Sequence, residues 1–172
     1  MRVFLLGFMG SGKSSIGKKL ASKMKLSFID LDRFIEKEIG CTVQDAFALH
    51  GEQYFREKEA DALDAVSTKE NVVIALGGGT PCFENNMELI TKSGISVYLH
   101  MDRTDLYNRL SKNRGNRPLL LSLNENELEA YVSSSLDARE EFYNQATIKI
   151  GAKDFNAEKY SALIEEISNY DR

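Results

Sequence analysis

Short apolar runs alternate with amphipathic stretches along the whole of the 172-residue chain. Residues 3–6, 71–76 and 95–99 form nearly continuous apolar runs, which are typical of strands buried on both faces of a sheet. Between these runs, apolar residues recur at helical spacing. Strands that alternate with helices need crossover connections, so the pattern predicts an α/β fold whose parallel sheet is covered on both faces.

Individual elements follow from the same pattern. The expected strands are residues 3–6, 26–32, 71–76, 95–99 and 146–150. The expected helices are residues 85–92, residues 103–112, and the segments with apolar stripes at Ile16, Leu20 and Met24, at Phe34, Ile35 and Ile39, at Leu128, Val132 and Leu136, and at Tyr160, Ile164 and Ile167. Thr42, followed by Asp45, should open a further helix that Gly51 interrupts, and Asn124 with Glu127 should cap the helix that follows them.

The length predicts a single domain over residues 1–172, because such a chain buries a full core but is short for two domains. Its composition of 42% hydrophobic and 28% charged residues is that of ordinary globular proteins. The net charge of −4 argues against nucleic-acid or anionic-membrane partners. No apolar run approaches the roughly 20 residues that span a bilayer, and no cleavage site follows the first apolar run. We therefore expect a cytoplasmic protein.

The two cysteines, Cys41 and Cys82, lie far apart and form no C-x-x-C motif. With His50 and His100 as the only histidines, the sequence offers no metal-ligand cluster of zinc type. Both cysteines are predicted to be free thiols. Cys82 follows a glycine run and could be a reactive thiol, but we favour a packing role for it.

Residues 7–14 read Gly-Phe-Met-Gly-Ser-Gly-Lys-Ser and match the pattern G-x-x-x-x-G-K-[ST] between an expected strand and an expected helix. Such a turn directs backbone N–H groups and a helix N-terminus at one point, which suits a phosphate chain. Lys13 would reach the β- and γ-phosphates of ATP, and the Ser14 hydroxyl would ligate Mg²⁺ directly. The predicted ATP-binding residues of this loop are Gly10, Ser11, Gly12, Lys13, Ser14 and Ser15. The alternative is a tight strand-to-helix turn with a solvent-exposed lysine.

Asp30 and Asp32 end the expected strand over residues 26–32. Side chains in a strand alternate, so the two carboxylates should point the same way. One could then serve the metal while the other faces a substrate hydroxyl. The alternative is that one of them caps the next helix, and the preceding phosphate-binding motif makes us favour the functional interpretation.

Two further features stand near the expected site. Arg56 and Glu59 lie three residues apart, hence on one helical face, and an ordinary surface ion pair would explain them by spacing alone. Gly77, Gly78 and Gly79 follow an apolar strand and would let the backbone approach a ligand closely. A flexible turn is the alternative for the glycines.

The segment over residues 109–117 holds four basic residues and no acid, namely Arg109, Lys112, Arg114 and Arg117. A solvated charge run is the usual explanation. In a phosphate-binding protein of negative net charge, the segment could instead be a mobile lid, at about residues 111–124, that folds over the triphosphate.

Taken in order, these motifs resemble those of the shikimate kinases across nearly the entire chain. The motifs are residues 7–14, Asp30-x-Asp32, Gly51-Glu52-x-x-Phe55-Arg56-x-x-Glu59, Gly77-Gly78-Gly79, Arg117-Pro118-Leu119-Leu120 and Arg139-x-x-x-Tyr143. The phosphate-binding loop alone would indicate only a nucleotide-binding superfamily, whereas the whole series is highly specific. The resemblance implies transfer of the γ-phosphoryl group of ATP to the 3-hydroxyl of shikimate, with Mg²⁺ as cofactor.

Residue roles are implied by the same resemblance. Asp32, Lys13 and Arg117 match catalytic positions, with Asp32 at the substrate hydroxyl and Arg117 on the ATP phosphates. Asp30 matches a residue that reaches Mg²⁺ through water. The matched substrate-binding residues are Asp32, Arg56, Gly78, Gly79 and Arg139. The implied fold is a P-loop three-layer sandwich with a five-stranded parallel sheet in the order 2-3-1-4-5 and a mobile lid. Separately, we expect the protein to be a monomer.

The sequence departs from the family pattern at position 110, where Leu stands and a second basic lid residue is common. Arg109 or Arg114 could fill that role, and the sequence does not choose between them. Residues 151–154, where the adenine is expected, include Lys153, whose contacts the sequence does not place. Two rival functions remain: a P-loop kinase of gluconate or a nucleoside monophosphate, and a nucleotide-dependent switch or inactive binding module.

Overall fold

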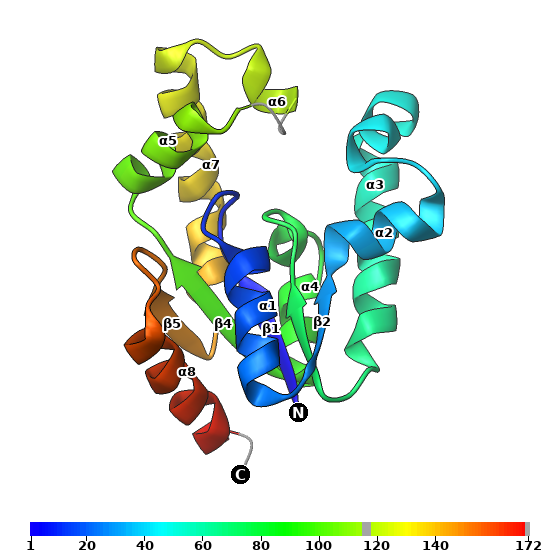
Figure 1. Ribbon diagram of the computed structural model, residues 1–172. Coiled ribbons are helices and arrows are strands. Elements are labelled where there is room, and N and C mark those ends of the chain that lie inside the picture. Colours follow the sequence, from blue (N-terminus) through cyan, green and yellow to red (C-terminus); the bar gives the residue numbers. More distant parts are fainter. Residues whose placement is uncertain (115–117, 171–172) are drawn as a thin grey trace.

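The computed structural model describes residues 1–114 and 118–170 and contains, within them, a five-stranded parallel sheet in the order β2-β3-β1-β4-β5 (Figure 1). The strands are β1 (Arg2–Leu6), β2 (Ser27–Asp30), β3 (Val72–Ala75), β4 (Ile95–His100) and β5 (Ile148–Gly151). Parallel pairing sets Val3 beside Val73 on one side of β1 and beside Ile95 on the other. The predicted fold class and strand order are confirmed.

Helices cover both faces of this sheet (Figure 1). They are α1 (Lys13–Met24), α2 (Leu31–Ile39), α3 (Val43–Ser67), α4 (Asn86–Ser93), α5 (Arg103–Lys112), α6 (Pro118–Leu121), α7 (Glu125–Tyr143) and α8 (Ala157–Tyr170), with a 3₁₀ turn η1 (Thr80–Cys82). Helices α1 and α8 pack together on one face, while α4 and α7 lie behind the sheet in the view of Figure 1 and α3 packs against α4. Among the described residues, no helix combines the length and apolar character needed to cross a bilayer.

The core forms where apolar strands meet apolar helix stripes. Val3, Phe4, Leu5 and Leu6 of β1 are completely buried, as expected for the central strand of a sheet covered on both sides. Helix α1 contributes the buried Leu20 from its predicted stripe. This packing fixes the positions of the loops that follow the carboxyl ends of β1 and β3.

Local capping signals operate as the sequence indicated. Thr42 caps α3 by accepting a hydrogen bond from the Asp45 N–H, and Gly51 interrupts that helix with a φ of 85°. Asn124 and Glu127 form a reciprocal capping box at the start of α7. Helix α6 was not predicted, because its four residues are too few to show a helical period.

The strand expected over residues 26–32 is shorter than predicted. Strand β2 ends at Asp30, and Asp32 already belongs to the first turn of α2. Asp30 caps α2, since its Oδ1 accepts a hydrogen bond from the Arg33 N–H at 3.4 Å. The argument that alternation within one strand aligns the two carboxylates is therefore wrong, and the capping alternative is correct for Asp30.

Candidate functional site

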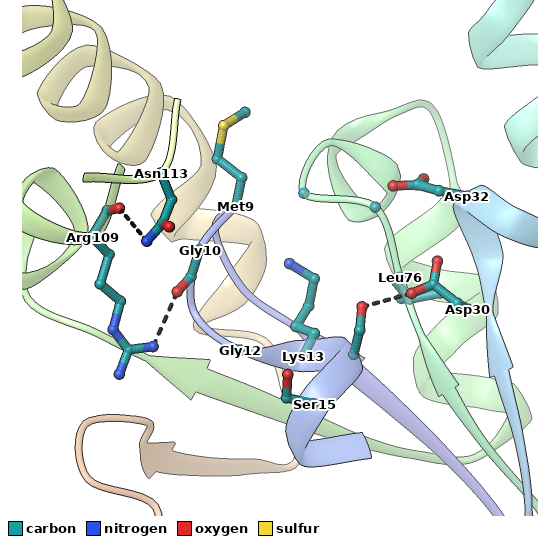
Figure 2. Close-up of a pocket in the computed structure, with 13 residues that line it drawn as sticks. Met9, Gly10, Gly12, Lys13, Ser15, Asp30, Asp32, Leu76, Arg109 and Asn113 are labelled. Carbon is teal, nitrogen blue, oxygen red and sulfur yellow. Dashed lines mark hydrogen bonds between the residues drawn. The ribbon is translucent and has the colours of Figure 1, made fainter. Parts of the chain in front are cut away.

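A cavity of about 570 Å³ lies beyond the carboxyl ends of β1, β2 and β3 (Figure 2). The strand order reverses around β1, and this is where open α/β sheets bind ligands. Its lining residues are Met9, Gly10, Gly12, Lys13, Ser14, Ser15, Asp30, Asp32, Leu76, Gly77, Gly78, Arg109 and Asn113. The structure thus brings together the predicted loop, the two aspartates and part of the glycine run.

The loop after β1 has the geometry of an anion cradle. Gly12, at the N-terminus of α1, has a left-handed backbone with φ 98°, which a residue with a side chain rarely adopts. The Lys13 ammonium curls back over the loop and donates to the Gly7 carbonyl oxygen at 2.7 Å and to that of Phe8 at 3.1 Å. The positive end of α1 and this ammonium therefore act on the same space, which favours a phosphate chain.

Ser14 and Asp30 form the oxygen-donor pair of the site. The Ser14 hydroxyl donates to Asp30 Oδ2 at 2.6 Å. Hydroxyl and carboxylate oxygens beside a phosphate cradle are the donor set that Mg²⁺ uses, since it takes few protein ligands and several from phosphate and water. No group of three or more His, Cys, Asp or Glu side chains suited to a metal occurs in the part of the chain that the structure describes. The donor set therefore fits Mg²⁺ bound together with a nucleotide.

Asp32 points into the cavity opposite Lys13 (Figure 2). The pKa of its carboxyl is raised from 3.8 to about 6, mainly by burial and also by the neighbouring carboxylates of Glu59 and Asp30, while Lys13 acts to lower it. A carboxyl with a pKa near neutrality can accept a proton from an alcohol that is being activated for attack. Asp32 therefore has the chemistry of a general base.

Arg56 and Glu59 are not the surface ion pair that their spacing alone suggests. Glu59 is only 1% exposed, and its Oε2 accepts a hydrogen bond from Arg56 Nη1 at 2.6 Å. Its other oxygen, Oε1, accepts from the Thr80 hydroxyl at 2.5 Å. Burial acts to lower the pKa of Arg56, but the Glu59 and Glu52 carboxylates raise it above its usual value. The guanidinium is thus charged and held in place.

Two arginines lie on the glycine run after β3. A Cβ added at Gly79 would come within 2.6 Å of Arg56 Nη2, so only glycine admits the guanidinium at this distance. A Cβ at Gly78 would come within 3.3 Å of Arg139 Nη1, and the Arg139 guanidinium carbon stands 5.3 Å from the centre of the Phe8 ring. Paired guanidinium groups beside open backbone are suited to a carboxylate ligand.

Arg109 and Asn113 also line the cavity; the sequence left Arg109 as one of two candidates for a lid cation and did not predict Asn113 as a site residue. Arg109 Nη1 donates to the Gly10 carbonyl oxygen at 3.2 Å, and Asn113 caps the same helix by donating to the Arg109 carbonyl oxygen at 3.2 Å (Figure 2). The Arg114 guanidinium instead donates to the Leu123 carbonyl oxygen. Between the two candidates for a second lid cation, the structure places Arg109 at the loop. Arg117, the predicted lid arginine, lies outside the described residues.

The structure also shows the surroundings of Cys82 and Lys153, whose roles the sequence left open. Burial raises the pKa of the half-buried Cys82 thiol from 9.0 to about 11, so it is protonated at neutral pH and a poor nucleophile. Lys153 pairs with Asp105 of α5, with 2.9 Å between Nζ and Oδ1. That ion pair ties the loop after β5 to the helix that carries Arg109.

Comparison with known proteins gives a consistent result. The family profile described as shikimate kinase matches residues 9–168. A shikimate kinase of Parabacteroides distasonis is 43% identical over 170 residues, covering 98% of this chain and 95% of that one. The crystal structure of shikimate kinase from Bacteroides thetaiotaomicron gives a TM-score of 0.90 at 36% identity, covering 99% of this chain and 97% of that one. The shikimate kinase from Acinetobacter baumannii, solved in complex with shikimate, gives a TM-score of 0.82 at 30% identity over 98% and 91% of the two chains.

Proposed function

The chain belongs to the shikimate kinase family, and we propose that its cavity transfers the γ-phosphoryl group of ATP to the 3-hydroxyl of shikimate. One observation carries this proposal: the phosphate cradle, the Asp32 carboxylate and the Arg56 clamp converge around a single glycine run. A phosphate cradle explains ATP, and a partly buried arginine beside open backbone explains an acceptor that carries a carboxylate. Asp32 lies among these groups, where the acceptor hydroxyl would meet the γ-phosphate.

For the nucleotide, we propose that Gly10, Ser11, Gly12, Lys13, Ser14 and Ser15 bind the phosphates of ATP. Backbone N–H groups at the start of α1 and the Lys13 ammonium would offset the charge that builds up during transfer. Ser14 would ligate Mg²⁺ directly and Asp30 through water. Mg²⁺ bound there would neutralise phosphate charge, and Asp30 would keep the Ser14 hydroxyl oriented for the metal.

For the acceptor, we propose that Arg56 and Arg139 bind the shikimate carboxylate beside the backbone of Gly78 and Gly79. Glu59 would keep the Arg56 guanidinium aimed at that point through the 2.6 Å contact. Asp32 would orient the hydroxyl and take its proton as the bond to phosphorus forms.

The proposal also covers the lid, the oligomeric state and the location of the protein. Arg117 would act on the ATP phosphates from a lid at about residues 111–124, a proposal supported by the Arg117-Pro118-Leu119-Leu120 motif. The proposed residues belong to one domain, 1–172, so a monomer would suffice. Free thiols at Cys41 and Cys82 favour a cytoplasmic location.

The decisive experiment measures ADP release with shikimate, gluconate and a set of nucleoside monophosphates as acceptors. We expect turnover that depends on shikimate and Mg²⁺. Turnover with gluconate or a nucleoside monophosphate but not with shikimate would contradict the proposed acceptor, and ATP binding without turnover on any acceptor would favour a switch or binding module. Lys13→Ala serves as the control, since it should remove nearly all turnover and weaken ATP binding while the fold survives.

A further inference from the structure

Tyr143, the last residue of α7, makes a contact that the mechanism above does not use. Its ring is completely buried and packs on that of Tyr98, with 5.1 Å between the ring centres. Its hydroxyl donates a hydrogen bond to the Gly78 carbonyl oxygen at 2.5 Å, across 65 positions of sequence. A buried phenol is thus joined to the middle of the glycine run.

This hydrogen bond fixes the orientation of one peptide group. The Gly78 carbonyl belongs to the peptide that joins Gly78 to Gly79, and the described peptide bonds include no cis bond. In a trans peptide, the C=O and N–H groups point in opposite directions. With the carbonyl oxygen directed at Tyr143, the Gly79 N–H therefore points away from it. Arg139 and Arg56 lie at Gly78 and Gly79, at the two ends of the same peptide.

We propose that Tyr143 is a positioning residue for binding of the acceptor. The Tyr143 hydroxyl holds the Gly78–Gly79 peptide so that the Gly78 carbonyl is turned away from the carboxylate site and the Gly79 N–H is available to that site. The inference rests on the proposed function, because it takes the acceptor to be a carboxylate. A peptide N–H favours a carboxylate as its ligand, whereas a carbonyl oxygen in the same place repels it.

A side-chain anchor is needed here because of the glycines. A peptide between two glycines rotates at little steric cost, so both orientations are accessible. Tyr143 selects one of them, and it remains able to donate, because burial raises the pKa of its phenol well above the usual value although the adjacent Arg139 acts to lower it. Only the fraction of molecules with the amide orientation binds the acceptor well.

The test is Tyr143→Phe, with Tyr98→Phe as the matched control. Both variants remove one phenol oxygen from the same buried ring pair, but only the first removes the hydrogen bond to Gly78. A net hydrogen-bond contribution corresponds to a change of about 3- to 10-fold in the populations of the two orientations. We expect the KM and Kd for shikimate to rise by about this factor in Tyr143→Phe, with kcat, the KM for ATP and the melting temperature close to those of Tyr98→Phe.

Other results would overturn the inference. A shikimate Kd in Tyr143→Phe equal to that of Tyr98→Phe would show that the hydroxyl does not position the acceptor site. Parallel losses in shikimate affinity, ATP affinity and melting temperature would indicate a general structural role instead. A parental chain that neither binds nor phosphorylates shikimate would contradict the proposed function, and this inference with it, whereas the first two results would leave the proposed function standing.

Discussion

At the residue scale, charge placement separates the roles of the two aspartates. Asp30 is tied to the Ser14 hydroxyl at 2.6 Å and caps α2, so its carboxylate is committed to hydrogen bonds. The pKa of Asp32 is raised mainly by burial and also by the carboxylates of Glu59 and Asp30, and Lys13 opposes them. Neighbouring acids of the same type thus occupy different electrostatic environments, one suited to a metal and its water shell and the other to proton transfer.

We predict that Asp32→Asn lowers kcat by about 10²- to 10⁴-fold, because asparagine keeps the size and a carbonyl acceptor but cannot take a proton. Binding of ATP with Mg²⁺ should persist, and the shikimate Kd should change less than kcat. Asp30→Asn is the comparison variant, and its defect should be partly relieved by raising Mg²⁺. Steady-state kinetics against Mg²⁺ measures both, and rescue of Asp32→Asn but not of Asp30→Asn would reverse the assignment.

Arg56 gives a second prediction at this scale. Arg56→Lys should raise the shikimate KM at least 10-fold, because a lysine has no planar pair of donors for a carboxylate and cannot also keep the contact with Glu59. The KM for ATP should stay within about 2-fold. Arg33→Lys, in an exposed ion pair with Glu36, is the matched control. Equal shikimate KM values in the two variants would exclude Arg56 from the carboxylate site.

At the element scale, the sequence predicted most helices and strands, because the apolar runs and stripes in this chain are long and regular. It failed at the boundary between β2 and α2, where Asp30 acts as a helix cap and a two-residue alternation imitates strand continuation. By spacing alone, the sequence also suggested that Glu59 belongs to a surface ion pair. Glu59 is in fact buried where α3 packs against η1, and these two segments are far apart in sequence. The spacing of residues indicates which face of a helix a residue lies on, but not which other element packs against that face.

Gly17 of α1 is another residue whose reason lies in packing between elements. A Cβ at this position would come within 2.6 Å of Cε2 of the Phe28 ring on β2 and within 2.9 Å of Leu5 Cδ1 on β1. Its absence lets α1 lie directly on the sheet, which sets the height of the phosphate cradle above β1.

We predict that Gly17→Ala destabilises the fold by about 1–3 kcal/mol, although alanine is the better helix former, because the added methyl overfills a closed contact. Its KM for ATP should rise, since α1 carries the cradle. The matched control is Ser22→Ala, an exposed position on the same helix, which should leave stability unchanged or slightly increased. Urea denaturation measures the free energy of unfolding, and a Gly17→Ala variant as stable as Ser22→Ala would refute the packing argument.

At the scale of the whole molecule, the sheet order places the ends of β1, β2 and β3 at one edge and so assembles the site from segments spread over more than half the chain (Figure 1). The sequence predicted this order through family resemblance, not through spacing. It named Arg109 only as one of two candidates for a lid cation and Tyr143 only as part of a family motif, because what each of them does depends on contacts with Gly10 and Gly78 across the fold.

Assembly of the site also has an energetic cost for the whole fold. Folding raises the pKa of Asp32 from 3.8 to about 6, so the native state holds this proton more tightly than the unfolded chain. Below pH 4 the carboxyl is protonated in both states and costs nothing. Between about pH 4 and pH 6 the unfolded chain loses the proton first, so this carboxyl lowers stability as pH rises. Above pH 6 the full cost applies and no longer changes with pH.

We therefore predict that Asp32→Asn, although inactive, is more stable than the parent by about 2–3 kcal/mol at pH 7–8, because the asparagine carries no charge to bury. The advantage should shrink toward zero at pH 4, where the parental carboxyl is protonated. Urea denaturation without nucleotide and Mg²⁺ measures it, and Asp64→Asn on the exposed face of α3 is the control for removing a surface carboxylate. A gain in the free energy of unfolding of equal size at pH 4 and pH 8 would show that titration of Asp32 is not its source. No gain at pH 8 would show that the charged Asp32 carboxylate does not destabilise the fold.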